Sequence, residues 1–245
     1  MFSQGRGPNS IEEAYKLQRA LRSIREARGE KVLGFKVGYT SKGVRKNLES
    51  IMGLTESVHG YLWDSESYKT GTVIDHRRLA IEGELGVKLL SVDSDDVSDW
   101  EVEFEPIVEI HMAGFDGPKE DDLGRRGLEL IATNCIHAGV VHSASTKRCL
   151  VGEISLNEVM TVWIGENQIE QVTLSELKIG NMLGPAATIS WLLKTLKSEG
   201  NKEEALLREG AAVICSTPGA LHLVPPRSEV RVEFSALETV CTAAS

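Results

Sequence analysis

Two stretches of the chain alternate apolar and polar residues with a period of two, and this pattern limits the possible folds more than any other feature. In 79–90 and in 101–111 the apolar side chains fall on one face of an extended strand: Ile81, Leu85, Val87 and Leu89, then Val102, Phe104, Val108 and Ile110. Successive side chains of a strand point to opposite faces. Each stretch therefore predicts a strand with one buried face, and the acidic loop 93–99 joins the two.

Acidic side chains occupy the other face of both predicted strands. Glu82 and Glu84 stand two residues apart and project together, and Glu109 on the second strand can join them. Carboxylates without a patterned Cys or His beside them suit Mg²⁺ or Mn²⁺ better than zinc. Gly83 would allow a ligand or another backbone to approach closely. The alternative is that these glutamates line a solvated sheet face.

Lys36 is the second candidate for a functional group. It lies in the alternating segment GFKVGYTS, where Gly34 and Gly38 share its face and leave the ammonium group clear of neighbouring side chains. A lysine in this position can bind a substrate carboxylate or transfer a proton. The alternative is an ordinary solvated lysine on a strand.

Among the six histidines, His59 is the strongest candidate for a catalytic role. It precedes a glycine in a segment, HGYLWDSESYKTGTVID, that we expect to be a loop with extended pieces, and loops often carry binding groups. A general base and a lid contact are both possible. We interpret the remaining histidines as ordinary structural residues, because no H-x-x-x-H or H-E-x-x-H pattern occurs.

Helices are predicted on either side of the strand-rich region. Ser10 can cap a helix that ends near Gly29, and 185–199 forms an amphipathic helix with Pro185 in its first turn and Gly200 after it. The 245 residues are enough to bury one sizeable core. We expect a single α+β domain over 1–245, with a short helical appendage over about 1–30.

Charge and composition exclude several classes of function. The formal net charge of −9 argues against a nucleic-acid partner, which would require a clustered basic surface. No uninterrupted apolar stretch is long enough for a membrane span, and the four cysteines form no C-x-x-C pair. No phosphate-binding glycine loop or G-x-S-x-G elbow occurs. We expect a cytoplasmic protein with reduced thiols.

Seven short motifs together resemble the small members of the fumarylacetoacetate hydrolase superfamily, namely 2-keto-4-pentenoate hydratases and 4-oxalocrotonate decarboxylases. They occur in the family's order: AYKLQ (14–18), GFKVGYTS (34–41), HGYL (59–62), IEGEL (81–85), PIVEI (106–110), GPAATISWLLKTL (184–196) and STPGALHLV (216–224). Two positions depart from the family pattern. Thr133 replaces an acid in the segment ATN, and His59 stands where other residue types are common.

The resemblance implies a mixed β-roll or β-sandwich core with helices outside. It also implies that Glu82, Glu84 and Glu109 bind Mg²⁺ or Mn²⁺ and that Lys36 is the active-site lysine. Ser216, with Ser41 and Asn134, is then expected to contact a small keto-acid substrate. A homo-oligomer is expected from the family.

Several reactions remain open for such a site. Hydration of a 2-hydroxy-2,4-dienoate to a 4-hydroxy-2-keto acid is our first hypothesis. Decarboxylation of a 4-oxalocrotonate-like diacid and C–C bond hydrolysis of a β-diketo acid are alternatives, because all three use the same electron sink at C2. A catalytically silent metal-binding scaffold is an alternative of another class, suggested by Thr133 and His59.

Overall fold

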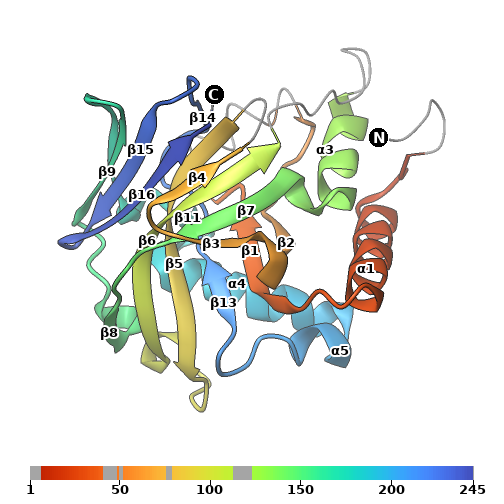
Figure 1. The fold of residues 1–245 in the computed structure, drawn as a ribbon. Helices are drawn as coiled ribbons and strands as arrows, with labels where there is room; N and C mark the ends of the chain where they lie inside the picture. The colour runs from red at the N-terminus through yellow and green to blue at the C-terminus, as the bar shows by residue number, and fades with distance from the viewer. Residues whose placement is uncertain (1–6, 41–48, 50–51, 76–78, 113–122, 245) are drawn as a thin grey trace.

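The structure is a computed structural model that describes residues 7–40, 49, 52–75, 79–112 and 123–244. Its helices among these residues are α1 (Ile11–Ala27), α3 (Leu123–Ala132), α4 (Gly184–Glu199) and the short α5 (Asn201–Glu204). Two β-sheets form the centre, and α1 and α3 lie on the side of the molecule opposite the smaller sheet (Figure 1). None of the described helices combines the length and the apolar character needed to cross a membrane.

The larger sheet is built around the two predicted strands. These are β5 (Leu79–Ser91) and β6 (Glu101–Met112), which pair antiparallel with Glu82 opposite Glu109. The main strand order is β2-β1-β13-β5-β6-β7-β3, with β14 added to β5 and β8 to β6. The other strands are β1 (Val32–Gly38), β2 (Val58–Trp63), β3 (Ser67–Lys69), β7 (His137–His142), β8 (Lys147–Leu150), β13 (Ala212–Ile214) and β14 (His222–Leu223).

The smaller sheet covers the apolar face of β5 and β6. Its order is β10-β9-β15-β16-β4, formed by β4 (Thr72–Ile74), β9 (Val159–Ile164), β10 (Asn167–Thr173), β15 (Glu229–Phe234) and β16 (Leu237–Ala243). A further pair, β11 (Lys178–Ile179) with β12 (Met182–Leu183), precedes α4. Apolar side chains of the larger sheet and of the smaller sheet form one buried core. The predicted α+β fold with a sandwiched core is confirmed.

Gly83 serves the packing of the two sheets. A Cβ at this position would lie 2.5 Å from Val162 Cγ2 of β9. The glycine thus leaves room for side chains of the smaller sheet. The close approach expected at this position is made by these core side chains, on the face away from Glu82 and Glu84. Its backbone oxygen still contributes to the site, as described below.

The predicted helices occur where capping signals mark them. The Ser10 side chain accepts a hydrogen bond from the Glu13 backbone N–H, and α1 ends two residues before Gly29. Helix α4 has Pro185 in its first turn and Gly200 as its C-cap. The segment expected as a loop around His59 is instead strand β2, whose residues are all buried. The segment KGVRKNLESIMG (42–53), whose sequence also predicts a short helix, lies largely outside the described residues.

Asn134 holds the outer edge of β2 in place. Its Oδ1 accepts a hydrogen bond from the Tyr61 backbone N–H at 2.7 Å, and its Nδ2 donates to the Tyr61 carbonyl at 2.9 Å. Gly60 permits this approach, because a Cβ there would lie 2.9 Å from Asn134 Oδ1. The side-chain amide therefore acts as a short substitute for a neighbouring strand.

Gly34 and Gly38 provide a matched test of strand packing. A Cβ at Gly34 would lie 1.9 Å from the Ala212 backbone oxygen of β13, whereas one at Gly38 meets only Val58 Cγ2 at an ordinary 3.7 Å. We expect Gly34→Ala to lower the free energy of unfolding by about 2 kcal/mol or more. Gly38→Ala should change it by less than about 1 kcal/mol. Urea denaturation checks both, and equal stabilities would contradict the close β1–β13 contact.

Asn134→Ala tests the edge contact in the same way. It leaves a buried backbone N–H and C=O of Tyr61 without their partners, so we expect a loss of about 2–3 kcal/mol in unfolding free energy. Asn134→Asp keeps the acceptor for the N–H and should recover part of that loss. Thermal denaturation of both variants provides the measurement. A stable Asn134→Ala variant that loses only ligand binding would instead support a substrate contact.

Candidate functional site

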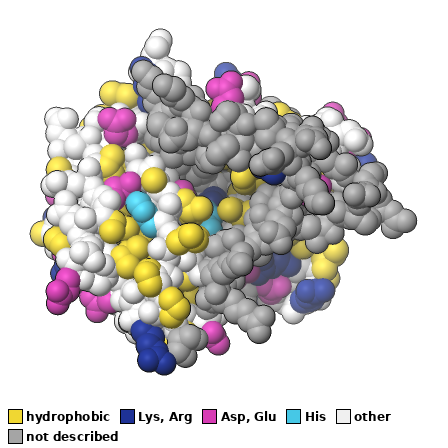
Figure 2. All heavy atoms as spheres, turned by 90° about the horizontal axis from the view of Figure 1, so that it is seen from above, with side chains coloured by type: hydrophobic (Ala, Val, Ile, Leu, Met, Phe, Trp, Pro, Cys, Tyr) yellow, Lys and Arg dark blue, Asp and Glu magenta, His cyan; other side chains and the backbone are white. Residues whose placement is uncertain are grey.

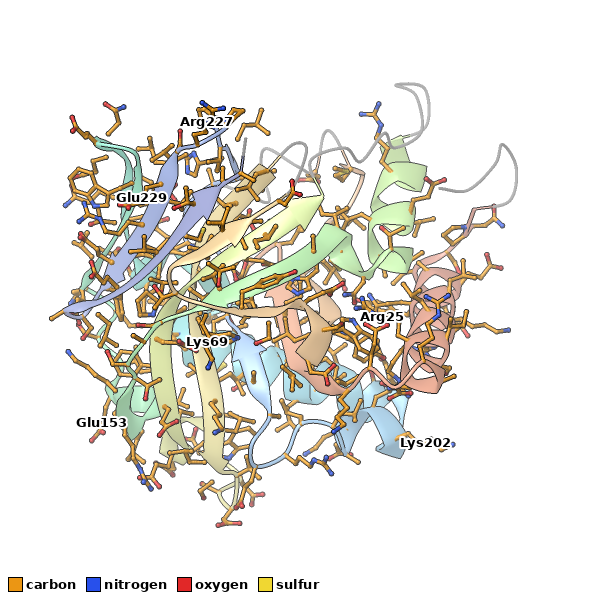
Figure 3. All side chains as sticks on the ribbon, in the orientation of Figure 1. Arg25, Lys69, Glu153, Lys202, Arg227 and Glu229 are labelled. Atoms are coloured by element: carbon orange, nitrogen blue, oxygen red, sulfur yellow. The ribbon has the colours of Figure 1, made fainter. Side chains whose placement is uncertain are left out.

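Three carboxylates are buried together on the face of β5 and β6 that lies away from the smaller sheet. Glu84 is 1% exposed and Glu109 is 0% exposed, while the Glu82 side chain keeps 15% exposure. Charged residues elsewhere, such as Glu153, Lys202 and Arg227, project from the outside of the molecule (Figure 3). Burying a carboxylate is costly unless a cation or hydrogen bonds compensate it. The alternative of a solvated sheet face is therefore wrong for these glutamates.

Lys36 supplies one of the compensating charges. Its Nζ lies 2.6 Å from Glu109 Oε1, and the lysine side chain is only 4% exposed. Burial lowers the pKa of Lys36, but Glu109 and Glu84 outweigh it and raise the pKa above its ordinary value. Gly34 and Gly38 flank Lys36 on β1. Lys36 is therefore a buried ammonium group held at the carboxylate cluster, not a solvated strand residue.

Two further histidines, for which the sequence predicted only structural roles, also belong to this cluster. His111 Nε2 lies 2.9 Å from Glu82 Oε2 and 3.5 Å from Glu109 Oε2. His137 Nδ1 lies 2.7 Å from Glu109 Oε1. His111 follows Glu109 by two residues and so shares its strand face, a signal that the alternation of 101–111 already contained. His137 lies on β7 and only the pairing of β6 with β7 brings it here.

The acids and bases of the cluster shift one another's pKa values. Burial lowers the pKa of His111, but Glu109 and Glu82 overcome this effect and raise it to about 9. Burial raises the pKa of Glu109, but Lys36 and His111 bring it well below its usual range. The pKa of Glu84 is raised by burial and by the negative charges of Glu109 and Glu82. The three carboxylates therefore bring several negative charges close together in the cluster.

The cluster offers donor atoms that could hold a metal ion. Glu82, Glu109 and His111 can each present one ligand atom, all within 4.8 Å of one another. Glu84 Oε2 and His137 Nε2 are buried and have no hydrogen-bond partner among the described residues. The oxygen donors fit Mg²⁺ or Mn²⁺. Zinc was disfavoured because the sequence pattern placed no histidine beside the acids, and the nitrogen donor of His111 removes that argument.

A cavity of about 450 Å³ opens beside the cluster. Lys36, Glu82 and His111 line one part of it, and Glu170 of β10 lines another part. The remaining lining is largely apolar and includes Tyr39, Met52, Val58, Leu130, Cys135, Ile136 and Leu221. On the face seen in Figure 2, histidine, acidic and hydrophobic side chains gather next to the grey residues. Its size suits a small organic acid.

The loop after β13 forms a wall of this cavity. Ser216 lines it with a left-handed backbone (φ 73°), and Thr217 Oγ1 donates to the Gly83 carbonyl at 3.0 Å. The same Thr217 oxygen accepts from the Gly219 N–H. The loop is thereby tied to β5 between Glu82 and Glu84. A non-glycine residue with positive φ is often found at a functional position.

Two other predicted site residues, His59 and Asn134, do not join this arrangement. His59 is fully buried on the opposite face from Lys36, stacked on Tyr15 at 4.6 Å between ring centroids, with Nε2 2.9 Å from Glu199 Oε1. The expectation of a catalytic His59 in a loop is corrected, because β2 directs its ring away from the cavity. Asn134 uses its amide on Tyr61. Ser41 lies outside the described residues.

Comparison with known proteins places this geometry in context. No protein-family model matches the chain. A curated 2-hydroxyhexa-2,4-dienoate hydratase from Comamonas testosteroni is 31% identical over 85 residues, which are 33% of this chain and 31% of the relative. The match thus spans about a third of that relative's length.

Solved structures match nearly the whole chain. A 4-oxalocrotonate decarboxylase from Pseudomonas putida G7, complexed with magnesium and adipate, superposes with a TM-score of 0.77 at 20% identity and covers 96% of this chain and 86% of its own. A fumarylpyruvate hydrolase from Pseudomonas aeruginosa, with Mn²⁺ and pyruvate, gives a TM-score of 0.60 at 11% identity, over 86% and 88% of the two chains. The chain therefore has the same fold as these solved decarboxylase and hydrolase structures, which agrees with the fold that the resemblance in its sequence implies.

Proposed function

We propose that this protein is a divalent-metal-dependent lyase acting on a small 2-keto or 2-hydroxydienoic acid. The observation that carries the proposal is the buried cluster of Glu82, Glu84 and Glu109 with His111 and Lys36 at the wall of a cavity of about 450 Å³. Such crowding of acids is costly for stability, and a function that uses the negative charge offers a reason for it.

Glu82, Glu84 and Glu109 would hold Mg²⁺ or Mn²⁺, with His111 as an additional donor or as a partner of the carboxylates. Two features support this assignment. Lys36 and His111 compensate the three acids only partly, and the pKa of Glu84 is raised by burial and by its acidic neighbours. A divalent cation would neutralise that charge. The solved decarboxylase and hydrolase of the same fold are described with magnesium and with Mn²⁺.

The residues of the chain would then bind and orient a keto acid. A bound divalent ion would polarise the C2 oxygen of the substrate and stabilise negative charge delocalised from C3. Lys36, held in its charged form by Glu109, can attract the substrate carboxylate and hold a proton at Nζ. The apolar side chains of the cavity limit access of bulk water, which strengthens these electrostatic contacts. Ser216 can contact the substrate from the loop after β13.

Hydration of a 2-hydroxy-2,4-dienoate is the reaction that we favour. The curated relative of 31% identity is a dienoate hydratase, although the match covers 85 residues. The second candidate is decarboxylation of a 2-keto diacid, which the whole-chain likeness to a 4-oxalocrotonate decarboxylase favours. Both reactions begin with a C1 carboxylate and a C2 oxygen at the same cluster. The chemistry at the far end of the substrate distinguishes them.

Glu82→Gln tests the metal site without any assumption about the reaction. With the intact protein, added Mg²⁺ or Mn²⁺ should raise the melting temperature, because a ligand that binds only the folded state stabilises it. The variant should lose most of this rise and bind the ion at least about 10-fold more weakly by calorimetry. Glu103→Gln, six residues along β6 from Glu109, is the matched control and should behave like the unmodified protein. An unchanged response of Glu82→Gln would contradict the assignment.

A substrate panel tests the reaction. With Mg²⁺ or Mn²⁺ present, we expect a 2-hydroxy-2,4-dienoate to lose its dienol absorbance without release of carbon dioxide, and chelation of the ion should abolish this turnover. Glu84→Gln should reduce kcat/KM by at least about 100-fold. Release of carbon dioxide from a 2-keto diacid would favour the decarboxylase instead. Metal binding without consumption of any acid in the panel would favour the silent scaffold.

A further inference from the structure

Glu170 brings a fourth carboxylate to the cavity from a different sheet. It lies on β10, the edge strand of the smaller sheet, whereas Glu82 lies on β5 of the larger sheet, and both side chains line the same cavity. The Glu170 side chain is only 13% exposed. Burial raises the pKa of Glu170, and the negative charge of Glu82 adds to this rise.

The loop 217–222 fixes the position of this carboxylate. The Ala220 backbone N–H donates to it, and a Cβ at Gly219 would lie 2.1 Å from its Oε2, so the carboxylate rests directly on the glycine backbone. His222 Nε2 lies 3.4 Å from Glu170 Oε2, and neither atom makes a well-aligned hydrogen bond among the described residues. The loop and His222 therefore hold the Glu170 carboxylate in place, and its Oε2 is buried.

The described residues around the cavity carry few positive charges. Lys36 and the candidate metal ligands can bind one carboxylate, and among the lining residues that the structure describes Lys36 is the one lysine or arginine. The lining otherwise consists mainly of apolar side chains, with Glu170 contributed by the smaller sheet. A second carboxylate on the substrate would have to lie in apolar surroundings near an acid.

We propose that Glu170 makes the cavity selective for substrates with a single carboxylate. This inference rests on the proposed function, because it takes the C1 carboxylate and C2 oxygen to bind at Glu82, Glu84, Glu109 and Lys36. The negative charge of Glu170 at the cavity wall repels a second carboxylate. Selectivity of this kind arises from a repulsive contact with the wrong ligand.

Two six-carbon 2-oxo acids test the proposal without turnover. 2-Oxohexanoate carries one carboxylate and 2-oxohexanedioate carries two, and the chains are otherwise alike. Calorimetry in the presence of Mn²⁺ should show that the unmodified protein binds the monoacid at least about 10-fold more tightly. Glu170→Gln, which keeps the size of the side chain, should reduce this ratio to about 3-fold or less, and Glu170→Lys should invert it. Glu166→Gln, an exposed acid beside β10, is the control and should keep the original ratio.

The possible outcomes separate this inference from the proposed function. If both acids bind equally well to the unmodified protein, the site for the keto acid stands and the selectivity of Glu170 is refuted. If the preference exists but Glu170→Gln and Glu170→Lys leave it unchanged, another group causes it and the inference fails. If neither acid binds while Mn²⁺ does, the proposed function and the inference fail together. Circular dichroism verifies that each variant is folded.

Discussion

The ion pair between Lys36 and Glu109 is the interaction on which the arrangement of the site depends. Glu109 has no exposure to solvent, so its charge must be compensated inside the protein, and Lys36 Nζ lies 2.6 Å away. The lysine reaches Glu109 from β1, which is separated from β6 by β13 and β5 in the sheet. Four strands must therefore keep their order for the charges to meet. Removing one partner would leave the other charged and buried.

The fold supports this cluster because the two faces of the larger sheet have different roles. One face of β5 and β6 packs on the smaller sheet, where Gly83 makes room for Val162. The other face carries the acids, His111 and the wall of the cavity. Because strand side chains alternate, neighbouring residues of the same two strands pack in the core and present the charges. The loop at Ser216 and Thr217 is fixed to the backbone of β5 between the acids.

The position of Glu170 shows how a second sheet can influence a site built on the first. Its backbone belongs to β10, and its carboxylate rests on Gly219 in the loop before β14. The acids on β5 and β6 and the acid on β10 therefore meet across one cavity from different layers.

The sequence by itself determined the strands 79–91 and 101–112, the faces of Glu82, Glu84 and Glu109, and the glycine-flanked Lys36, because side-chain alternation is a local property of an extended chain. It also contained the signal for His111. Only the tertiary structure decided that His137 contacts Glu109 and that Glu170 lines the cavity, since strand order and sheet packing bring these residues together over long separations in the chain. The structure likewise turned His59 away and engaged Asn134 with Tyr61, because pairing of β2 with β1 assigns its residues to faces that local patterns left open.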